Sequence, residues 1–150
     1  MVTIKNLKDC PEYAEKAAEM LYSYFGKEES FNMDFFKAAV ISPAAKDGIP
    51  ATFIAFYDNE PAGSVCLWRS DMLSRQDLTP WLANLFVKEE FRKNHIGSAL
   101  QKQLVSYAKE LGFEKVWLYT DLVDYYEKTG WQQCDRGVET DGKVKRIYYI

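Results

Sequence analysis

A strand–helix–strand pattern in the second half of the chain constrains the fold more than any other feature. Residues 81–87 (WLANLFV) form a nearly continuous apolar run, which is typical of a strand that is covered on both faces. Apolar residues three or four positions apart predict a helix over 96–111, and 115–120 (KVWLYT) is predicted to be another buried strand. Strand, helix and strand within about 30 residues match a βαβ unit, in which the two strands are parallel and the crossover is right-handed. The loop 88–97 then opens at the carboxyl end of the first strand, where open α/β sheets bind ligands.

The start of the predicted helix carries residues that suit an anion. The stretch 91–100 (FRKNHIGSAL) places Arg92, Lys93 and the only histidine of the chain just before a Gly-Ser-Ala step. The first N–H groups of a helix have no intrahelical partner and lie at the positive end of the macrodipole. Gly97 lets a bulky anion approach the backbone because no Cβ stands in the way. A diphosphate fits this chemistry, although Arg92, Lys93 and Asn94 can equally form a solvated loop that only caps the helix. The spacing matches neither GxGxxG nor GxxxxGKS/T, which argues against dinucleotide oxidoreductases and P-loop hydrolases.

The remaining segments predict a mixed sheet accompanied by further helices. After a first short strand, we expect a helix over 9–26, capped by Asp9, and a second helix over 31–41. Two hairpins supply antiparallel strands, and a short helical segment precedes the second hairpin. These predicted segments are strands 2–7, 51–58, 63–70, 131–140 and 143–150, turns 59–62 and 141–142, loops 44–50 and 71–80, and a short helix over 122–130.

Size and composition fit one globular domain that spans residues 1–150. The chain has 47% hydrophobic and 27% charged residues, which is an ordinary composition with enough apolar material for a core. No apolar run reaches the roughly 18 residues of a membrane span, and the N-terminus lacks a signal-peptide hydrophobic segment, so we expect a cytoplasmic protein without a membrane partner. A net charge of -3 argues against a general nucleic-acid surface. Cys10, Cys66 and Cys134 are odd in number and are not spaced with histidine as metal ligands, so neither a disulfide framework nor a metal site is expected.

The first of two motifs resembles a signature of the GCN5-related N-acetyltransferases (GNAT). The stretch 85–104 (LFVKEEFRKNHIGSALQKQL) resembles motif A of that family, which reads Arg or Gln, two residues, Gly, one residue, then Gly or Ala. Arg92, His95 and Gly97 stand at the three signature positions. The sequence therefore departs from the family at the first glycine, which is His95.

A second motif lies downstream of the first, in the order that the family shows. Residues 124–131 (DYYEKTGW) look like the family segment FYEKLGF. Tyr126 then stands at the position of the tyrosine that faces the sulfur of the cofactor. The resemblance runs through roughly residues 52–134, and two motifs in the right order are more specific than either alone.

The resemblance implies an α/β (α+β) GNAT fold and an acetyl-CoA site. The expected fold has a mixed central sheet of about seven strands, helices on both faces, and a splay between the two central parallel strands. The pantetheine arm would lie in that gap and bond to the backbone of the first strand, while the diphosphate would rest on the N–H groups of residues 93–98. The residues implied in cofactor binding are Leu85, Phe86, Val87, Arg92, Lys93, Asn94, His95, Ile96, Gly97, Ser98 and Tyr126.

The implied chemistry is direct transfer of an acetyl group from acetyl-CoA to a primary amine of a small molecule or peptide. Tyr126 suits the acid because a phenol can donate a proton or a hydrogen bond to the leaving thiolate. The N–H near Val87 is the expected partner of the thioester oxygen. Asn84 can orient a water but cannot take a proton, and Asp121 is a candidate base that can equally be a helix N-cap. His95 falls at the diphosphate end, far from the reacting carbonyl.

The acceptor and the partners stay open at this point. Large aromatics can wall an acceptor pocket but are more often plain core, and carboxylates on the loop 71–80 can hold a cationic amine or be exposed loop residues. A catalytically silent acetyl-CoA-binding module is the alternative to an enzyme, and a homodimer is left open. The residues considered for the acceptor side are Tyr57, Trp68, Trp81, Asp71 and Asp77.

Overall fold

A seven-stranded mixed sheet organises the part of the chain that the computed structural model describes, residues 1–26, 32–41 and 48–150. The strand order is β1-β2-β3-β4-β5-β7-β6, and every neighbouring pair is antiparallel except β4 and β5. The strands are β1 Val2–Asn6, β2 Ala51–Tyr57, β3 Glu60–Trp68, β4 Trp81–Val87, β5 Trp117–Thr120, β6 Gln132–Val138 and β7 Val144–Tyr149.

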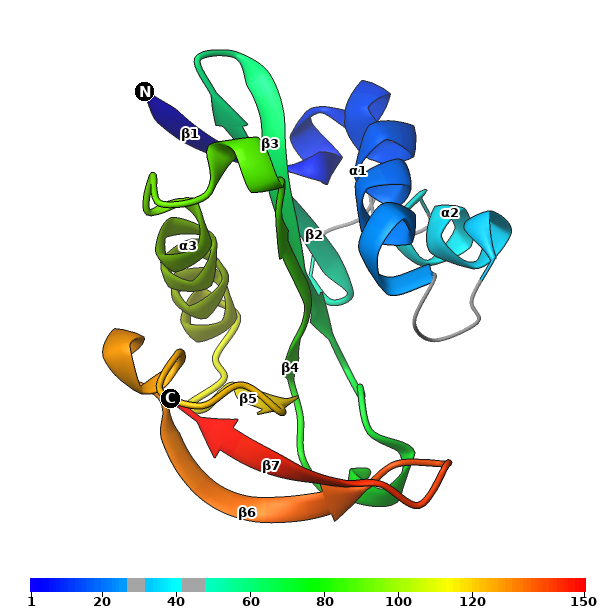
Figure 1. Ribbon diagram of the computed structural model, residues 1–150, viewed down its shortest axis with the longest axis vertical. Helices are drawn as coiled ribbons and strands as arrows, with labels where there is room; N and C mark the ends of the chain where they lie inside the picture. Colours follow the sequence, from blue (N-terminus) through cyan, green and yellow to red (C-terminus); the bar gives the residue numbers. More distant parts are fainter. Residues whose placement is uncertain (27–31, 42–47) are drawn as a thin grey trace.

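Helices cover both faces of this sheet (Figure 1). On one face, α1 and α2 pack on apolar side chains of β2 and β3 that include Ile54 and Cys66. On the other face, α3 buries Leu100 and Leu104 against Val65 and its neighbours. The α-helices are α1 Ala14–Leu21, α2 Met33–Ile41 and α3 Ile96–Glu110; α1 continues into a π-helical turn, η3 Tyr22–Gly26, and short 3₁₀ turns are η1 Leu7–Asp9, η2 Pro11–Tyr13, η5 Leu73–Arg75, η6 Glu89–Phe91 and η7 Glu127–Thr129. Helices on both faces confirm the expected layers.

The two parallel strands touch at one end only. Trp81 of β4 is in register with Trp117 of β5, and the Trp117 N–H donates to the carbonyl of Pro80 at 3.0 Å. No further residue pair joins β4 and β5, so the strands diverge toward the carboxyl end of β4. The predicted parallel pair and its splay are therefore both present.

A β-bulge in β4 marks the point of divergence. On β3, Ser64 pairs with Phe86 and Cys66 pairs with Ala83, so two residues of β4 oppose one of β3. One of the two, Asn84, has a left-handed backbone with φ 53°. A bulge bends its strand and re-aims its side chains, which accounts for β4 turning away from β5.

Three local expectations were wrong, each for a backbone reason. Asp9 does not cap α1: the Asn6 side chain accepts a hydrogen bond from the Lys8 N–H at 3.1 Å and starts a 3₁₀ turn that contains Asp9. The β2–β3 turn lies at Asp58 and Asn59, whose φ values of 48° and 70° fit a two-residue hairpin turn, so β3 starts before the predicted position.

The third error concerns the predicted short helix over 122–130. Asp124 has φ 56°, and a left-handed residue cannot continue a right-handed helix, so only the three residues of η7 are helical. Phe31 of the second predicted helix and residues 44–47 of the predicted loop lie outside the described residues. Among the described helices, none is long and apolar enough to cross a membrane.

Candidate active site

The loop that enters α3 is bent so that its main-chain N–H groups converge. Lys93 and His95 both have left-handed backbones, with φ 68° and 58°. Alternation of left-handed and ordinary residues turns successive N–H groups toward one side, which makes a concavity for an anion. The Asn94 side chain holds this bend, because its Nδ2 donates to the carbonyl of Phe91 at 3.1 Å. His95 therefore takes the backbone conformation that a glycine adopts most readily.

The N–H groups of residues 93–98 form an unpaired cup. The Ala99 N–H makes the first helical bond, to the carbonyl of His95 at 3.0 Å. Within the described parts of the chain, no hydrogen bond uses an N–H of residues 93–98 as donor. The first N–H groups of a helix have no intrahelical partner and lie at the positive end of its dipole, so these donors are suited to bind an anion.

A cavity of about 670 Å³, here called the amide cavity, lies against this cup. Gly97 lines it, and a Cβ added to Gly97 would stand 2.9 Å from the Tyr125 hydroxyl. Burial raises the pKa of Tyr125, which keeps this phenol protonated. Arg92 brings a positive charge to the rim, while its Nε donates to the carbonyl of Val87 at 3.2 Å.

The main chain of β4 faces the gap at Val87. The Phe86 carbonyl points to β3, since it lies 2.5 Å from where a Cβ on Gly63 would be. The Lys88 N–H also points to β3 and donates to Ala62 at 2.9 Å. Because the N–H and C=O of one trans peptide point in opposite directions, the Val87 N–H and C=O both face the gap between β4 and β5.

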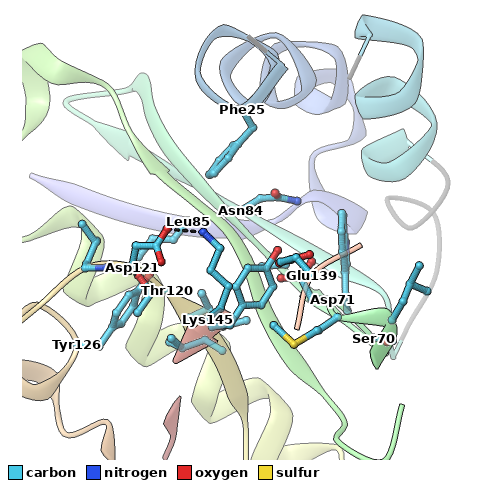
Figure 2. A pocket seen from close by; sticks show the side chains of 18 of the residues that line it. Phe25, Ser70, Asp71, Asn84, Leu85, Thr120, Asp121, Tyr126, Glu139 and Lys145 are labelled. Carbon is cyan, nitrogen blue, oxygen red and sulfur yellow. Dashed lines mark hydrogen bonds and ion pairs between the residues drawn. The ribbon is translucent and has the colours of Figure 1, made fainter. Parts of the chain in front are cut away.

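A second cavity of about 740 Å³, which Tyr126 also lines, is here called the acidic cavity (Figure 2). Asp121 lines it at the end of β5 and forms an ion pair with Lys145 of β7. The Asp121 carbonyl also accepts a hydrogen bond from Arg146 Nη2 at 2.9 Å. Asp71 and Glu139 line the same cavity, so three carboxylates face one ammonium group among its described lining residues.

Tyr126 stands where the two cavities meet. Four side chains line both cavities, and they come from η3, β4 and the segment after β5: Tyr24, Leu85, Leu122 and Tyr126. Tyr126 is 8% exposed, and its ring lies 6.0 Å from that of Trp131. Burial raises the pKa of the Tyr126 phenol well above its ordinary value, so the hydroxyl stays protonated and is a hydrogen-bond donor in neutral and mildly alkaline solution.

A buried glutamine fixes the segment that carries Tyr126. Gln101 of α3 is 3% exposed, and its Oε1 accepts hydrogen bonds from Thr129 Oγ1 at 2.7 Å and from Trp131 Nε1 at 3.0 Å. The carbonyl of Tyr126 in turn accepts from the Thr129 N–H at 3.0 Å. The start of α3 therefore supplies the N–H cup, while Gln101 in the next turn holds the segment that carries Tyr126.

The bulge places Asn84 on the wall of the acidic cavity, with its side-chain amide nitrogen buried. Its Nδ2 is buried and has no hydrogen-bond partner among the described residues, and its side chain contacts the Cys66 thiol. The Cys66 Sγ lies 3.6 Å from Thr52 Oγ1. A buried donor without a partner is costly, so Asn84 is suited to bind a ligand or water in the cavity.

The predicted site residues divide between the two cavities. Leu85 and Tyr126 line both cavities, while Asn84 and Asp121 line the acidic one. Asn94 shapes the loop without lining a cavity. The amide cavity also contains these predicted residues: Phe86, Val87, Arg92, Lys93, His95, Ile96, Gly97 and Ser98.

Two of the five residues considered for the acceptor side line the acidic cavity, and the other three do not. Trp68 and Asp71 line the acidic cavity. Trp81 is fully buried in the core, and the ring of Tyr57 packs on that of Phe91 at 5.6 Å. Asp77 binds Arg75 on the surface, so its carboxylate is not part of the cavity.

Sequence reasoning missed four residues of this region: Tyr125, Gln101, Glu139 and Lys145. A polar residue on the apolar stripe of the α3 helix was a usable signal for Gln101. Glu139 and Lys145 carry no such signal, because the β6–β7 hairpin brings them to the cavity from the end of the chain. Among the described residues, no group of three His, Cys, Asp or Glu side chains is arranged to hold a metal ion.

Comparisons with known proteins agree with this geometry. Residues 11–131 match the family model described as the acetyltransferase (GNAT) family. An uncharacterized N-acetyltransferase of Methanocaldococcus jannaschii is 27% identical over 97% of this chain, which spans 65% of the length of that relative.

Two solved structures share the fold. An aminoglycoside 6'-N-acetyltransferase complexed with coenzyme A has a TM-score of 0.76 at 16% identity, over 99% of this chain and 96% of its own. A streptothricin acetyltransferase, described as putative, from Bacillus anthracis in complex with acetyl coenzyme A has a TM-score of 0.59 at 18% identity, over 70% of this chain and 64% of its own. With a family model that covers most of its length and a splayed parallel strand pair of the expected kind, the chain belongs to the GNAT family of acetyltransferases.

Proposed function

We propose that this protein is an N-acetyltransferase that moves the acetyl group of acetyl-CoA to a primary amine by direct attack. The observation that carries the proposal is the cup of N–H groups over residues 93–98, which opens into the same cavity as Tyr126. A linked pair of phosphates needs several donors at one point, and a reacting thioester needs a donor beside it. One continuous cavity offers both.

The residues of the amide cavity fit the parts of acetyl-CoA. The cup would hold the diphosphate, with Arg92 and Lys93 adding formal positive charge at its rim. The main chain of β4 at Leu85 and Val87, where β4 and β5 are no longer paired, would bind the pantetheine arm as an additional strand binds a sheet edge. Gly97 leaves the space that the phosphates require.

Acetyl-CoA would supply the acetyl group as a thioester. In the transfer, the neutral amine nitrogen forms a bond to the carbonyl carbon, the carbon–sulfur bond breaks, and the amine gives up a proton. The Val87 N–H faces the gap and would stabilise the developing oxyanion. Tyr126 would donate a hydrogen bond to the departing sulfur, and its raised pKa favours this role over complete loss of its proton.

The proton of the amine needs an acceptor on the side of the acidic cavity. Asp121 is a carboxylate that lines this cavity, and Asn84 can orient a water there. The ion pair with Lys145 holds the Asp121 carboxylate at the wall of the cavity. We therefore propose Asp121, directly or through a water at Asn84, as the group that takes this proton.

A panel of primary amines, incubated with acetyl-CoA while free thiol is measured, tests the function. We expect thiol release that depends on both the protein and the amine, with the acetylated amine detected by mass spectrometry. Binding of acetyl-CoA without thiol release from any amine would instead support a silent binding module. The cytoplasmic location and the homodimer of the sequence analysis stay predictions.

A further inference from the structure

The segment that carries Tyr126 leaves the sheet at the end of β5 and returns to it at β7. It spans residues 121–127 and is here called the Tyr126 loop. The last residue of β5 pairs with Arg146 of β7, so the loop starts beside Arg146. It comes back to the same strand at Tyr148, whose hydroxyl donates to Glu127 Oε1 at 2.6 Å. The two ends of the loop therefore meet β7 two residues apart, or about 7 Å in a strand.

Little within the loop itself fixes the ring of Tyr126. Residues 121–125 are all exposed, and the side chains of Leu122 and Val123 are among the most exposed apolar groups of the described chain. Asp124 has a left-handed backbone, so a regular helix does not hold the loop. The position of Tyr126 therefore depends on the contacts that other elements make with this segment.

Two side chains on one face of β7 contact the ends of the loop. Arg146 Nη2 donates to the carbonyl of Asp121 at 2.9 Å and to that of Leu122 at 3.2 Å. Tyr148 lies two residues farther along β7, which puts it on the same face of the strand, and it bonds Glu127. Arg146 thus holds the start of the loop, and Tyr148 holds its end.

Tyr148 is a firm support for the residues around Tyr126. It is 1% exposed, and its ring centroid lies 6.5 Å from that of Tyr126. The hydrogen bond from Tyr148 lowers the pKa of Glu127, and the nearby charge of Arg146 acts in the same direction. The acceptor is therefore a charged carboxylate, which makes this hydrogen bond stronger than one between neutral groups.

We propose that Tyr148 is a positioning residue for acetyl transfer, which through Glu127 sets where the Tyr126 hydroxyl stands. Arg146 acts with it by holding the start of the same loop. The described linings of the two cavities include neither Tyr148 nor Glu127, so the role is not a contact with cofactor or acceptor. This inference rests on the proposed function, because its effect on the reaction is exerted through Tyr126.

Hydrogen exchange tests the contact without any substrate. The N–H groups of Thr129 and Trp131 both donate to the carbonyl of Tyr126, at 3.0 and 3.2 Å, and report on its position. In Tyr148→Phe we expect both amides to exchange about 10-fold faster, because the end of the loop loses its anchor. The N–H of Leu104 in the middle of α3 should keep its wild-type rate.

The neighbouring residue of β7 provides the matched control. Tyr149→Phe removes a hydroxyl that bonds Gln132 instead of the loop, and it should leave the exchange of the two reporting amides unchanged. Wild-type exchange in Tyr148→Phe would overturn the proposal. A rise that the amides of α3 share equally would also overturn it, since it would mean a general loss of stability.

Kinetics test whether the positioning acts on transfer. The assay uses acetyl-CoA and the primary amine from which the wild type releases thiol fastest. Tyr148→Phe should lower kcat about 10-fold and leave the affinity for coenzyme A, measured by calorimetry, unchanged. In a Tyr126→Phe background the same change should lower kcat no further, because the two residues act as a unit. Losses that multiply in the double variant would show that Tyr148 does not act through Tyr126.

Variants of the carboxylate test the hydrogen bond itself. Glu127→Gln keeps an oxygen that can accept from Tyr148, so its kcat should fall less than that of Glu127→Ala. Equal losses in the two variants would overturn the role of this bond.

The outcomes separate this inference from the proposed function. Thiol release at equal kcat in Tyr148→Phe and the wild type would overturn the inference and leave the transferase intact. Absence of thiol release from the wild type with every amine would remove the transfer reaction and the catalytic part of the inference. The exchange rates would then still decide whether Tyr148 holds the Tyr126 loop.

Discussion

Tyr125 and Tyr126 are neighbours in sequence, but their hydroxyls belong to different parts of the site. Tyr125 reaches over Gly97 and lines the amide cavity alone. Tyr126 is buried deeper and lines both cavities. Asp124, the residue before them, has a left-handed backbone, which turns the chain just before the two tyrosines. The phenol at the junction can reach both cavities, and the phenol over the cup reaches only the amide cavity.

Replacing Tyr126 with phenylalanine should slow transfer without weakening the cofactor. The change removes only the hydroxyl that would donate to the sulfur, so we expect kcat to fall on the order of 10²-fold, at the lower end of acid–base effects. The affinity for coenzyme A, measured by calorimetry, should stay nearly the same. Tyr149→Phe removes a hydroxyl that bonds Gln132 far from the cavities and is the matched control. Equal kcat in Tyr126→Phe and the wild type would exclude this role.

Filling the cup from Gly97 should abolish cofactor binding. A glutamate there places a side chain and a negative charge where the phosphates would lie, so Gly97→Glu should show no detectable heat with coenzyme A. Gln103→Glu adds the same charge at an exposed position of α3 outside the cavity and should bind nearly as the wild type does. Retained affinity in Gly97→Glu would move the diphosphate to another place.

Residues of one local motif were predictable, and residues that meet only in the fold were not. Gly97 and Tyr126, which line the amide cavity, could be named from the sequence because each belongs to a short contiguous segment with a recognisable residue pattern. Glu139 and Lys145 reach the acidic cavity through the pairing of β6 and β7, which no local pattern encodes. The left-handed φ of His95 could not be read from a histidine, which adopts that region less readily than glycine does.

At the scale of elements, α3 couples the two halves of the site. Its first turn supplies the N–H cup, and Gln101 in its second turn holds the segment of Tyr126. The periodicity of apolar residues predicted this helix and the flanking strands well, because burial of one stripe is a strong signal. The start of α1 was predicted less well: Pro11 begins a separate 3₁₀ turn, so the α-helix starts only at Ala14.

Gln101→Met should weaken this coupling. The change keeps a side chain of similar volume but leaves the buried Trp131 Nε1 without its acceptor, which should cost about 1–3 kcal/mol in the free energy of unfolding. Urea unfolding measures this loss, and kcat should fall with it because Tyr126 is held less firmly. Gln103→Met on the exposed side of the same helix should change the stability by less than about 0.5 kcal/mol. Equal stability of the two variants would contradict the bridging role.

At the scale of the whole molecule, the bulge in β4 and the splay between β4 and β5 occur together, because the bulge bends β4 away from β5. The sheet stays closed on the β3 side of β4 and opens on the β5 side, so two cavities reach Tyr126, which we propose for cofactor and acceptor. The bulge lies over a buried polar group of Cys66, Thr52 and Asn84, below the helices α1 and α2. Sequence patterns predicted the strands around this point and the parallel pair of β4 and β5 but not the bulge, because Asn84 sits in an ordinary apolar strand pattern.

That buried group makes the stability of the molecule depend on alkaline pH. Burial raises the pKa of Cys66 from its ordinary value of 9.0 to about 11, so the folded state keeps a proton that the unfolded state loses. The free energy of unfolding should therefore be constant below pH 9 and fall between pH 9 and 11, by about 1.4 kcal/mol per pH unit at most. Urea unfolding from pH 8 to 10, below the range where tyrosines dominate, measures this slope. Cys66→Ala should reduce most of it even if a cavity lowers stability at every pH, whereas Cys134→Ala, at an exposed position where burial raises the thiol pKa less, should reduce it less. An unchanged slope in Cys66→Ala would show that another group carries the pH dependence.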